Sequence, residues 1–410
     1  MKCYLIFYIL LFLGQQVLAQ EPVKLRTLLK DARMAIKNNR GQEAAEKKLL
    51  DVLGRGDIGT AEEAEIYFTA QELRRSINDQ ENLKVYLRQS YDTIKFFSTI
   101  LQMHQYILRC DSAEQAGRKK FVHRKKGREV LLAYRKNLLN GGKYLLQKGR
   151  AAEAFPYFDM YLKTVDEPMM EFSMSLQADT LLPRVAYWAT LSAYNANQPE
   201  AALRYMDYAI AGTDSTLRVS LTEYQALCYL AVGDTAQWLK TLKRGVQYYP
   251  HHDFFYLHLM NYYDTQKAYT EGLALSERMM DKVGVRDIYW FGKCQMYMGQ
   301  KDYDHCITAA NQVIGLDSLF VDAYYNKGIA YLNKAIAFAQ TASTDLHSAK
   351  SRRDRATLRG LYGYARGPME KVRALQPEDK QRWGEPLYSI YLNLNLGEEF
   401  AAIEKLLNEK

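Results

Sequence analysis

The segment Asp322-Ala-Tyr-Tyr-Asn-Lys-Gly-Ile-Ala-Tyr331 contains the pattern that decides the fold of this chain. Within it, Tyr324, Gly328 and Tyr331 follow one another at intervals of four and three residues, so their side chains share one face of a helix. Tyr331 is also the last of four tyrosines that stand 34 residues apart, at positions 229, 263, 297 and 331. A fixed period of this length predicts an array of helix–turn–helix units.

The same register extends to the residues around each tyrosine. Three residues before the tyrosines stand Ala226, Met260, Cys294 and Gly328. Twelve residues after the first three of these stand Trp238, Gly272 and Cys306. This interval fits the end of one helix, a short turn and the first part of a second helix. Pro250 and Pro377 close two of the units, because proline cannot extend a helix.

This pattern of an aromatic residue, a small residue and tyrosine, then a small residue, a hydrophobic pair and proline, resembles the tetratricopeptide repeat (TPR) family. Residues 322–331 match the family's first helix best. Trp238 and Met260 replace small residues of the family pattern, which predicts that their units shift register or splay. Segments 134–144 and 383–391 resemble exported TPR proteins of the Bacteroidetes. We therefore expect an all-α, right-handed superhelical solenoid of antiparallel helix pairs; the resemblance implies no activity.

Residues 1–19 are expected to be a signal peptide. Lys2 precedes an apolar run from Tyr4 to Leu13, and Val17-Leu18-Ala19 has the small-residue pattern of a cleavage site. The run is too short to favour a membrane-spanning helix. We expect an exported protein, periplasmic or otherwise extracytoplasmic, with no membrane span in the mature chain. An uncleaved anchor is the alternative.

Residues 20–410 are expected to form a single solenoid with a helical insertion at about 336–360. After Gly328, the next small position of a second helix is Ala365, which lies 37 residues further on instead of 12. Both helices of this unit are therefore expected to be longer and to project as a hairpin. Near the amino terminus, Asn78-Asp79 predicts a turn that divides residues 61–90 into a helix pair.

Composition and motifs argue against most kinds of chemistry. The chain carries 55 Lys and Arg against 47 Asp and Glu, a net charge of +8 that we interpret as solubility rather than nucleic-acid binding. The sequence contains no Gly-x-Ser-x-Gly, phosphate loop or Cys-x-x-Cys motif, and its histidines lack metal-ligand spacing. We expect no catalytic residue, no metal and no cofactor.

Cys294 and Cys306 fall at the small positions where two helices of one unit approach most closely. An exported chain would permit a disulfide between them. The alternative is a pair of buried thiols that pack as small hydrophobic groups.

Two surfaces are candidates for binding. The insertion presents Arg352, Arg353 and Arg355, either as a contact for an acidic partner or as a solvated extension. The first helices of a solenoid line its concave face. There we expect Tyr187, Tyr194, Asn261, Phe291, Met298 and Tyr325, unless they pack into the neighbouring unit.

The leading hypothesis is a non-catalytic, exported scaffold that binds a protein or peptide on its concave face. One alternative is an accessory binding protein for a carbohydrate or other small molecule. Another is a self-associating structural part of an envelope assembly.

Overall fold

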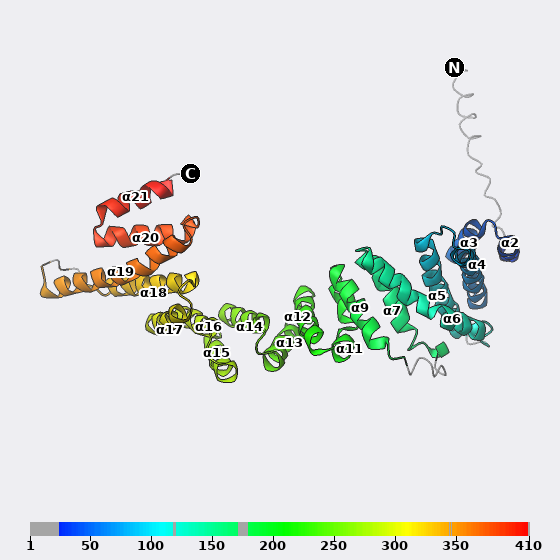
Figure 1. Ribbon diagram of the computed structural model, residues 1–410, viewed down its shortest axis with the longest axis horizontal. Coiled ribbons are helices and arrows are strands. Elements are labelled where there is room, and N and C mark those ends of the chain that lie inside the picture. The colour runs from blue at the N-terminus through cyan, green and yellow to red at the C-terminus, as the bar shows by residue number, and fades with distance from the viewer. Residues whose placement is uncertain (1–23, 118–119, 171–178, 344, 346, 409–410) are drawn as a thin grey trace, which may run out of the picture. The chain divides into compact units, whose positions relative to one another are not determined.

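The part of the chain that the structure describes is built mainly from α-helices (Figure 1). The computed structural model describes residues 24–117, 120–170, 179–343, 345 and 347–408, and no strand occurs among them. The expected all-α solenoid of antiparallel helix pairs is confirmed. The predicted signal peptide, residues 1–19, lies outside the described residues.

The chain divides into two compact units, and the boundary falls inside one helix. The N-terminal unit ends at Tyr224, and the C-terminal unit begins at Gln225. Each unit has its own apolar core. Among the described residues, every helix is either too short or too polar to span a lipid bilayer.

In the described part of the N-terminal unit, three long helices follow a shorter pair and precede shorter helices. Its elements are α2 (Leu25–Lys37), α3 (Gln42–Leu50), η1 (Asp51–Gly54), α4 (Thr60–Tyr86), α5 (Thr93–Ala116), α6 (Arg124–Gln147), α7 (Ala151–Lys163), η2 (Pro168–Met170), α9 (Leu182–Asn195), α10 (Pro199–Leu203), α11 (Met206–Ala211) and most of α12 (Ser215–Ala231).

The predicted turn at Asn78-Asp79 is wrong, because α4 continues through it without a break. Asn78 is only 1% exposed. Its side-chain amide donates to the carbonyl of Phe96, at 2.8 Å, and to the hydroxyl of Thr99, at 2.9 Å. Both acceptors belong to α5, so this asparagine joins two long helices instead of ending one.

The C-terminal unit repeats one helix pair along its length. Its helices are α13 (Thr235–Tyr248), α14 (Asp253–Thr265), α15 (Tyr269–Val283), α16 (Asp287–Gly299), α17 (Tyr303–Leu316), α18 (Val321–Ala339), α19 (Ala349–Leu375), α20 (Lys380–Leu394) and α21 (Gly397–Asn408). The second helices α13, α15 and α17 begin 34 residues apart, as do the first helices α14, α16 and α18. The period in the sequence is therefore the period of the structure.

The turns inside these pairs share one backbone geometry. The second residue after each first helix adopts a left-handed conformation, with φ of 77° at Gly233, 55° at Lys267 and 63° at Lys301. The next backbone N–H then donates to the carbonyl of Tyr229, Tyr263 or Tyr297 at 2.8–2.9 Å. This arrangement is a Schellman motif, which satisfies carbonyl groups that the end of a helix leaves without partners.

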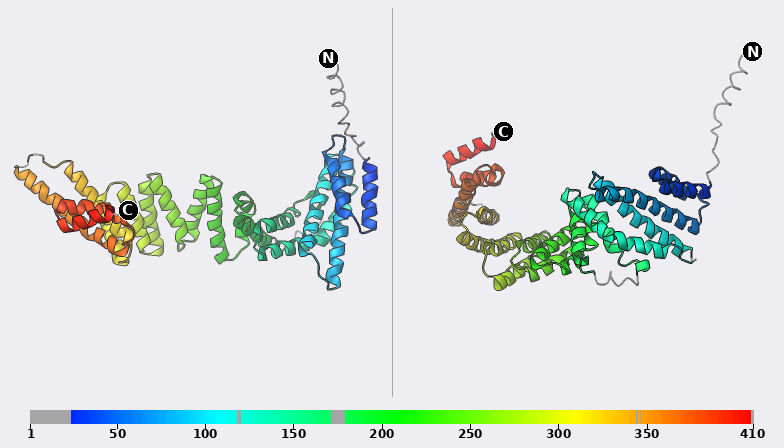
Figure 2. Two further views of the ribbon diagram at one scale, coloured as in Figure 1. Left: turned by 90° about the horizontal axis from the view of Figure 1, so that it is seen from above. Right: turned by 45° about the vertical axis from the view of Figure 1, so that its right-hand side comes forward.

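The fourth tyrosine lies where the repeat is lengthened. α18 continues past Tyr331 to Ala339, and α19 is almost twice as long as α17 (27 against 14 residues). Figure 2 shows the two helices extending as a hairpin, as expected from the spacing. Packing at the base keeps the register, since a Cβ atom on Gly328 would lie 3.6 Å from the carbonyl of Ala365.

Candidate functional site

Most of the residues expected on a concave face make contacts inside their own unit. In the N-terminal unit, Tyr194 stacks on Tyr224 with ring centroids 4.2 Å apart, and Tyr187 is half-buried. Burial raises the pKa of the Tyr187 hydroxyl. Both tyrosines belong to α9, and their rings contribute to packing between helices.

The same holds for three of the four such residues in the C-terminal unit. Phe291 lies against Phe320, with ring centroids 4.9 Å apart. Tyr325 lies under the guanidinium group of Arg382, 4.6 Å from the ring centroid. Met298 is half-buried, and its sulfur lies 3.9 Å from the side-chain nitrogen of Asn333. Asn261 alone is exposed. A binding role for this row stays a prediction.

The hairpin of α18 and α19 exposes a strongly basic stretch. Lys350, Arg352, Arg353, Arg355 and Arg359 are all exposed. The carboxylate of Asp354 does not lie free among them, because it accepts a hydrogen bond at 2.9 Å from the backbone of Ser343 at the hairpin turn. The structure therefore places the three predicted arginines together on an accessible helix.

A cleft that the sequence did not predict lies between successive second helices of the C-terminal unit. Its volume is about 440 Å³. One wall comes from α13, the floor from α14 and the other wall from α15. The lining residues are Lys243, Val246, Gln247, Leu259, Tyr263, Leu275, Arg278, Met279 and Lys282. Three of these nine side chains are cationic and none is acidic.

The cations and the tyrosine surround an apolar floor. Lys243 and Arg278 are exposed, and neither forms an ion pair with another described residue. Lys282 donates a hydrogen bond of 2.6 Å to the backbone carbonyl of Gln247, so it spans the two walls. Burial raises the pKa of Tyr263, which keeps its hydroxyl protonated at neutral pH, although the nearby Arg278 cation opposes that shift. The cleft can therefore present two free cations and a hydroxyl group to one ligand.

Helix spacing explains why the cleft opens here. The first helices α14, α16, α18 and α20 contact one another in succession, whereas the second helices α13, α15 and α17 do not approach as closely. The second helices thus spread on the outer side. In addition, α14 packs less extensively on α13 and α15 than α16 does on α17. Met260 and Trp238 replace small residues in α14 and α13. The helix starts keep the 34-residue register, and the expected splaying of these units stays a prediction.

The charge of the cleft is not repeated along the array. Thirty-four residues after Lys243, Arg278 and Lys282 stand Glu277, Gln312 and Leu316. The backbone pattern recurs from pair to pair, but this set of cations does not. These cations are therefore not required to form the helix pairs. Their occurrence in one pair marks the cleft as a candidate site. Comparing equivalent positions in the sequence could have revealed it.

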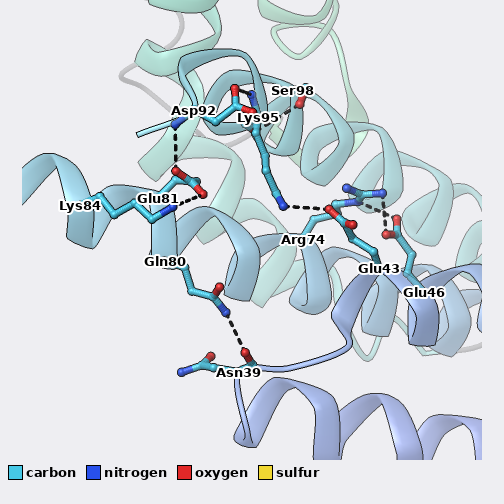
Figure 3. Close-up of polar contacts among 10 residues, drawn as sticks. All are labelled: Asn39, Glu43, Glu46, Arg74, Gln80, Glu81, Lys84, Asp92, Lys95 and Ser98. Atoms are coloured by element: carbon cyan, nitrogen blue, oxygen red, sulfur yellow. Dashed lines mark hydrogen bonds and ion pairs between the residues drawn. The ribbon is translucent and has the colours of Figure 1, made fainter. Parts of the chain in front are cut away.

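Several carboxylates of the N-terminal unit form ion pairs within the unit. Figure 3 shows Glu46 paired with Arg74, Glu43 with Lys95, and Glu81 with Lys84. Glu46 is 2% exposed and also accepts a hydrogen bond of 2.7 Å from the hydroxyl of Tyr106. Two of these pairs join α3 to α4 and to α5, and the third lies within α4.

A wider hollow of about 830 Å³ in the same unit carries mixed charge. Arg33 and Arg75 line it together with Glu72 and Asp79. Burial raises the pKa of Glu72. Because both signs of charge face this space, it offers less selectivity for one class of ligand than the cleft beside α14.

The two cysteines singled out in the sequence do meet. Their sulfur atoms lie 3.4 Å apart between α16 and α17, and both are present as thiols. Within the described residues, no group of three or more histidine, cysteine, aspartate or glutamate side chains is arranged to hold a metal ion.

Comparison with known proteins gives similarity in fold only. No protein-family model and no curated protein matches the sequence. Among solved structures, the C-terminal part of a TPR repeat-containing protein from Cytophaga hutchinsonii is 12% identical and covers 64% of this chain and 92% of its own, with a TM-score of 0.43. A TPR repeats protein from Bacteroides fragilis is 16% identical and covers 66% of this chain and 98% of its own, with a TM-score of 0.30.

YrrB, described as a TPR protein with an unusual peptide-binding site, is 13% identical and covers 59% of this chain and 87% of its own, with a TM-score of 0.26. These identities and TM-scores are too low to carry an argument about binding. The assignment of helix pairs with a 34-residue repeat therefore rests on this chain's own helices and turns.

Proposed function

We propose that this protein is a non-catalytic interaction scaffold that binds an acidic peptide segment of a partner protein in the cleft beside α14. The observation that carries the proposal is the lining of that cleft, which combines three cations, a tyrosine hydroxyl and an apolar floor with no carboxylate. Solenoids present extended surfaces that suit multi-contact docking of this kind.

The character of the floor favours a peptide over a lipid-like chain. Leu259, Leu275 and Met279 are each 1% exposed, so they are already sheltered from water. A long alkyl chain would remove little additional apolar surface and would gain little free energy. Carboxylates would instead meet Lys243 and Arg278, whose charges have no ion-pair partner among the residues that the structure describes. Electrostatic attraction should therefore dominate, and binding should weaken as salt screens it.

A direct test uses a short fluorescent peptide that contains Asp, Glu and Leu, titrated by anisotropy against the full chain. A peptide of the same length with Lys in place of the acids is the ligand control. We expect the acidic peptide to bind at low salt and the basic one not to bind. Replacing Lys243 and Arg278 together with alanine should weaken binding by about 1–2 kcal/mol, roughly five- to thirtyfold.

The matched control is Lys240→Ala, because Lys240 is an exposed cation of the same helix that does not line the cleft. This variant should bind like the unaltered chain. Equal affinity of the cleft double variant would contradict the proposal. A loss of binding on deleting residues 341–359, with the double variant unaffected, would assign recognition to the basic hairpin instead.

We further propose that the chain is exported and acts outside the cytoplasm. The apolar run from Tyr4 to Leu13 and the cleavage pattern at Val17-Leu18-Ala19 support this proposal. Expression in a bacterial host, followed by cell fractionation and amino-terminal sequencing, tests it. A mature chain beginning at Gln20 or Glu21 in the extracytoplasmic fraction is expected. An intact amino terminus in the cytoplasm would contradict it.

A further inference from the structure

The two cysteines of the α16–α17 pair occupy one small, closed environment. Cys294 and Cys306 are both 0% exposed, and their sulfur atoms lie 3.4 Å apart. The buried side chains packed around them are Ile307, Ala309, Ala310 and Ala330, and partly buried aromatic rings cover this cluster. Asp302 acts on Cys306 through its charge, but a negative charge raises the pKa of a thiol and so does not activate it. Within the described residues, the site is therefore a buried pair of thiols that lacks the cationic surroundings of a reactive cysteine.

We propose that Cys294 and Cys306 form a redox-sensitive pair whose state is set while the chain folds and is then retained. In the presence of a low-molecular-weight disulfide, the pair closes into an intramolecular disulfide that links α16 to α17. In its absence, the pair is buried as two thiols. The oxidation state of the α16–α17 hairpin would thus depend on the redox conditions under which the chain folded.

The chemistry is two successive thiol–disulfide exchanges. The thiolate of one cysteine attacks a sulfur of the small disulfide and releases one small thiol, leaving a mixed disulfide on the protein. The second cysteine then attacks the protein sulfur of that mixed disulfide and releases the second small thiol. Two protein thiols are oxidised to one disulfide, and the small disulfide is reduced to two thiols.

The geometry permits closure with a small movement. A disulfide needs sulfur atoms about 2.05 Å apart, so each sulfur must move by less than ~1 Å from its present position. The pair lies twelve residues apart across one tight turn, so the two helices are already held side by side. Closure therefore stabilises an arrangement that the fold already has.

Burial explains why the redox state should be set during folding. Exchange requires a thiolate and an approach path for the oxidant. The hydrogen-bonding contact with Cys294 and the apolar surroundings raise the pKa of Cys306, so thiolate is scarce in the folded state. With 0% exposure, a small disulfide cannot reach either sulfur unless α16 and α17 separate. Before the two helices pack, both thiols are accessible and have ordinary reactivity.

The test compares two orders of addition on the full chain. In one, the reduced, unfolded protein is diluted into a mixture of oxidised and reduced glutathione. In the other, the protein is folded first under reducing conditions and then receives the same mixture. Free thiols are alkylated, and peptide mapping by mass spectrometry locates any link. We expect the Cys294–Cys306 link in nearly all molecules of the first sample, and oxidation at least tenfold slower in the second.

Two control variants test whether the effect is specific to Cys294 and Cys306. Cys110 is also a buried thiol with a raised pKa, so Cys110→Ala should leave the link unchanged. Adding a reductant to the unfolded, oxidised chain and refolding it should lower its thermal midpoint, whereas the Cys294→Ala/Cys306→Ala variant should show no such difference. Free Cys294 and Cys306 after oxidative refolding would overturn the proposal. Equal oxidation rates in both samples would overturn the role of folding.

Discussion

Acidification should destabilise the N-terminal unit through His104, a buried histidine of α5. Its side chain is 0% exposed, and its Nδ1 atom lies 2.8 Å from the carbonyl of Ile100, to which it donates. Burial lowers the pKa of His104 from 6.5 to about 4, and the nearby Arg135 cation acts in the same direction. The folded state therefore holds this ring neutral under conditions in which the unfolded chain would protonate it.

The size of the effect follows from the difference between these two pKa values. Above pH 6.5 the ring is neutral in both states. His104 therefore contributes nothing to the pH dependence of the free energy of unfolding in that range. Between pH 6.5 and about 4 the unfolded state binds a proton that the folded state excludes, so the free energy of unfolding falls as pH falls. At about 1.4 kcal/mol for each pH unit, the full loss is ~3 kcal/mol, of which ~2 kcal/mol is reached by pH 5.

The measurement is urea unfolding at several pH values, with His104→Asn as the comparison. Asparagine keeps a side-chain N–H near the carbonyl of Ile100 but cannot be protonated. The variant should be less stable at pH 7 because of its smaller volume. From pH 7 to 5, however, it should lose about 2 kcal/mol less than the unaltered chain. Other titrating groups contribute equally to both proteins and cancel in this difference. Parallel stability curves would refute the reasoning.

Equivalent positions in successive helix pairs suggest further substitutions. Asp at the position before α13 and before α17 accepts a hydrogen bond from the helix backbone, whereas Ala268 stands at the same position before α15. Ala268→Asp should therefore stabilise the C-terminal unit by about 1 kcal/mol, measured as a higher urea midpoint. Gly245→Ala should destabilise the C-terminal unit by about 1–3 kcal/mol, because the new Cβ atom would lie 2.2 Å from the ring of Phe255. Gly363→Ala is the control, because a Cβ atom there would have no neighbouring atom within 4 Å. This variant should not destabilise the unit. Lys301→Gly should raise the thermal midpoint by up to a few degrees, because glycine adopts the φ of 63° without strain. A lower midpoint would contradict this prediction, since it would mean that the larger conformational entropy lost by glycine on folding outweighs the removed strain.

The regular part of the fold was predictable because one physical pattern recurs in it. The tyrosines mark the face of each first helix, and small residues mark where the second helix approaches. The lengthening of α18 and α19 followed from the interval between Gly328 and Ala365. The approach of Cys294 and Cys306 followed from the same register. Each of these features depends on spacing along the chain, which the sequence states directly.

Features that depend on a partner in space were not predictable in this way. Asn78 is a residue type that favours turns. However, α5 supplies two acceptors for its side chain, and α4 continues through this position. Lys267 and Lys301 have no turn-forming tendency, yet they adopt the left-handed conformation because the Schellman motif requires it. The cleft beside α14 arises from the spread of three helices, and no single segment encodes it.

The expected binding row shows the same limit. Phe291 and Tyr325 lie on the first helices, as expected, but the following pair supplies contacts for both rings. Sequence periodicity identifies which face of a helix a residue occupies. It does not reveal whether the next unit covers that face, because coverage depends on the distance and angle between successive pairs.

The hairpin of α18 and α19 has a consequence for how such a chain can change over time. Gly328 and Ala365 keep their contact although 37 residues separate them, against 12 between Cys294 and Cys306. Even a flexible connection of threefold greater length costs only about 1 kcal/mol more to close. A turn of this array can therefore acquire a new segment in one insertion event while the neighbouring pairs remain folded. The equivalent turns at Gly233, Lys267 and Lys301 should accept foreign sequences in the laboratory for the same reason.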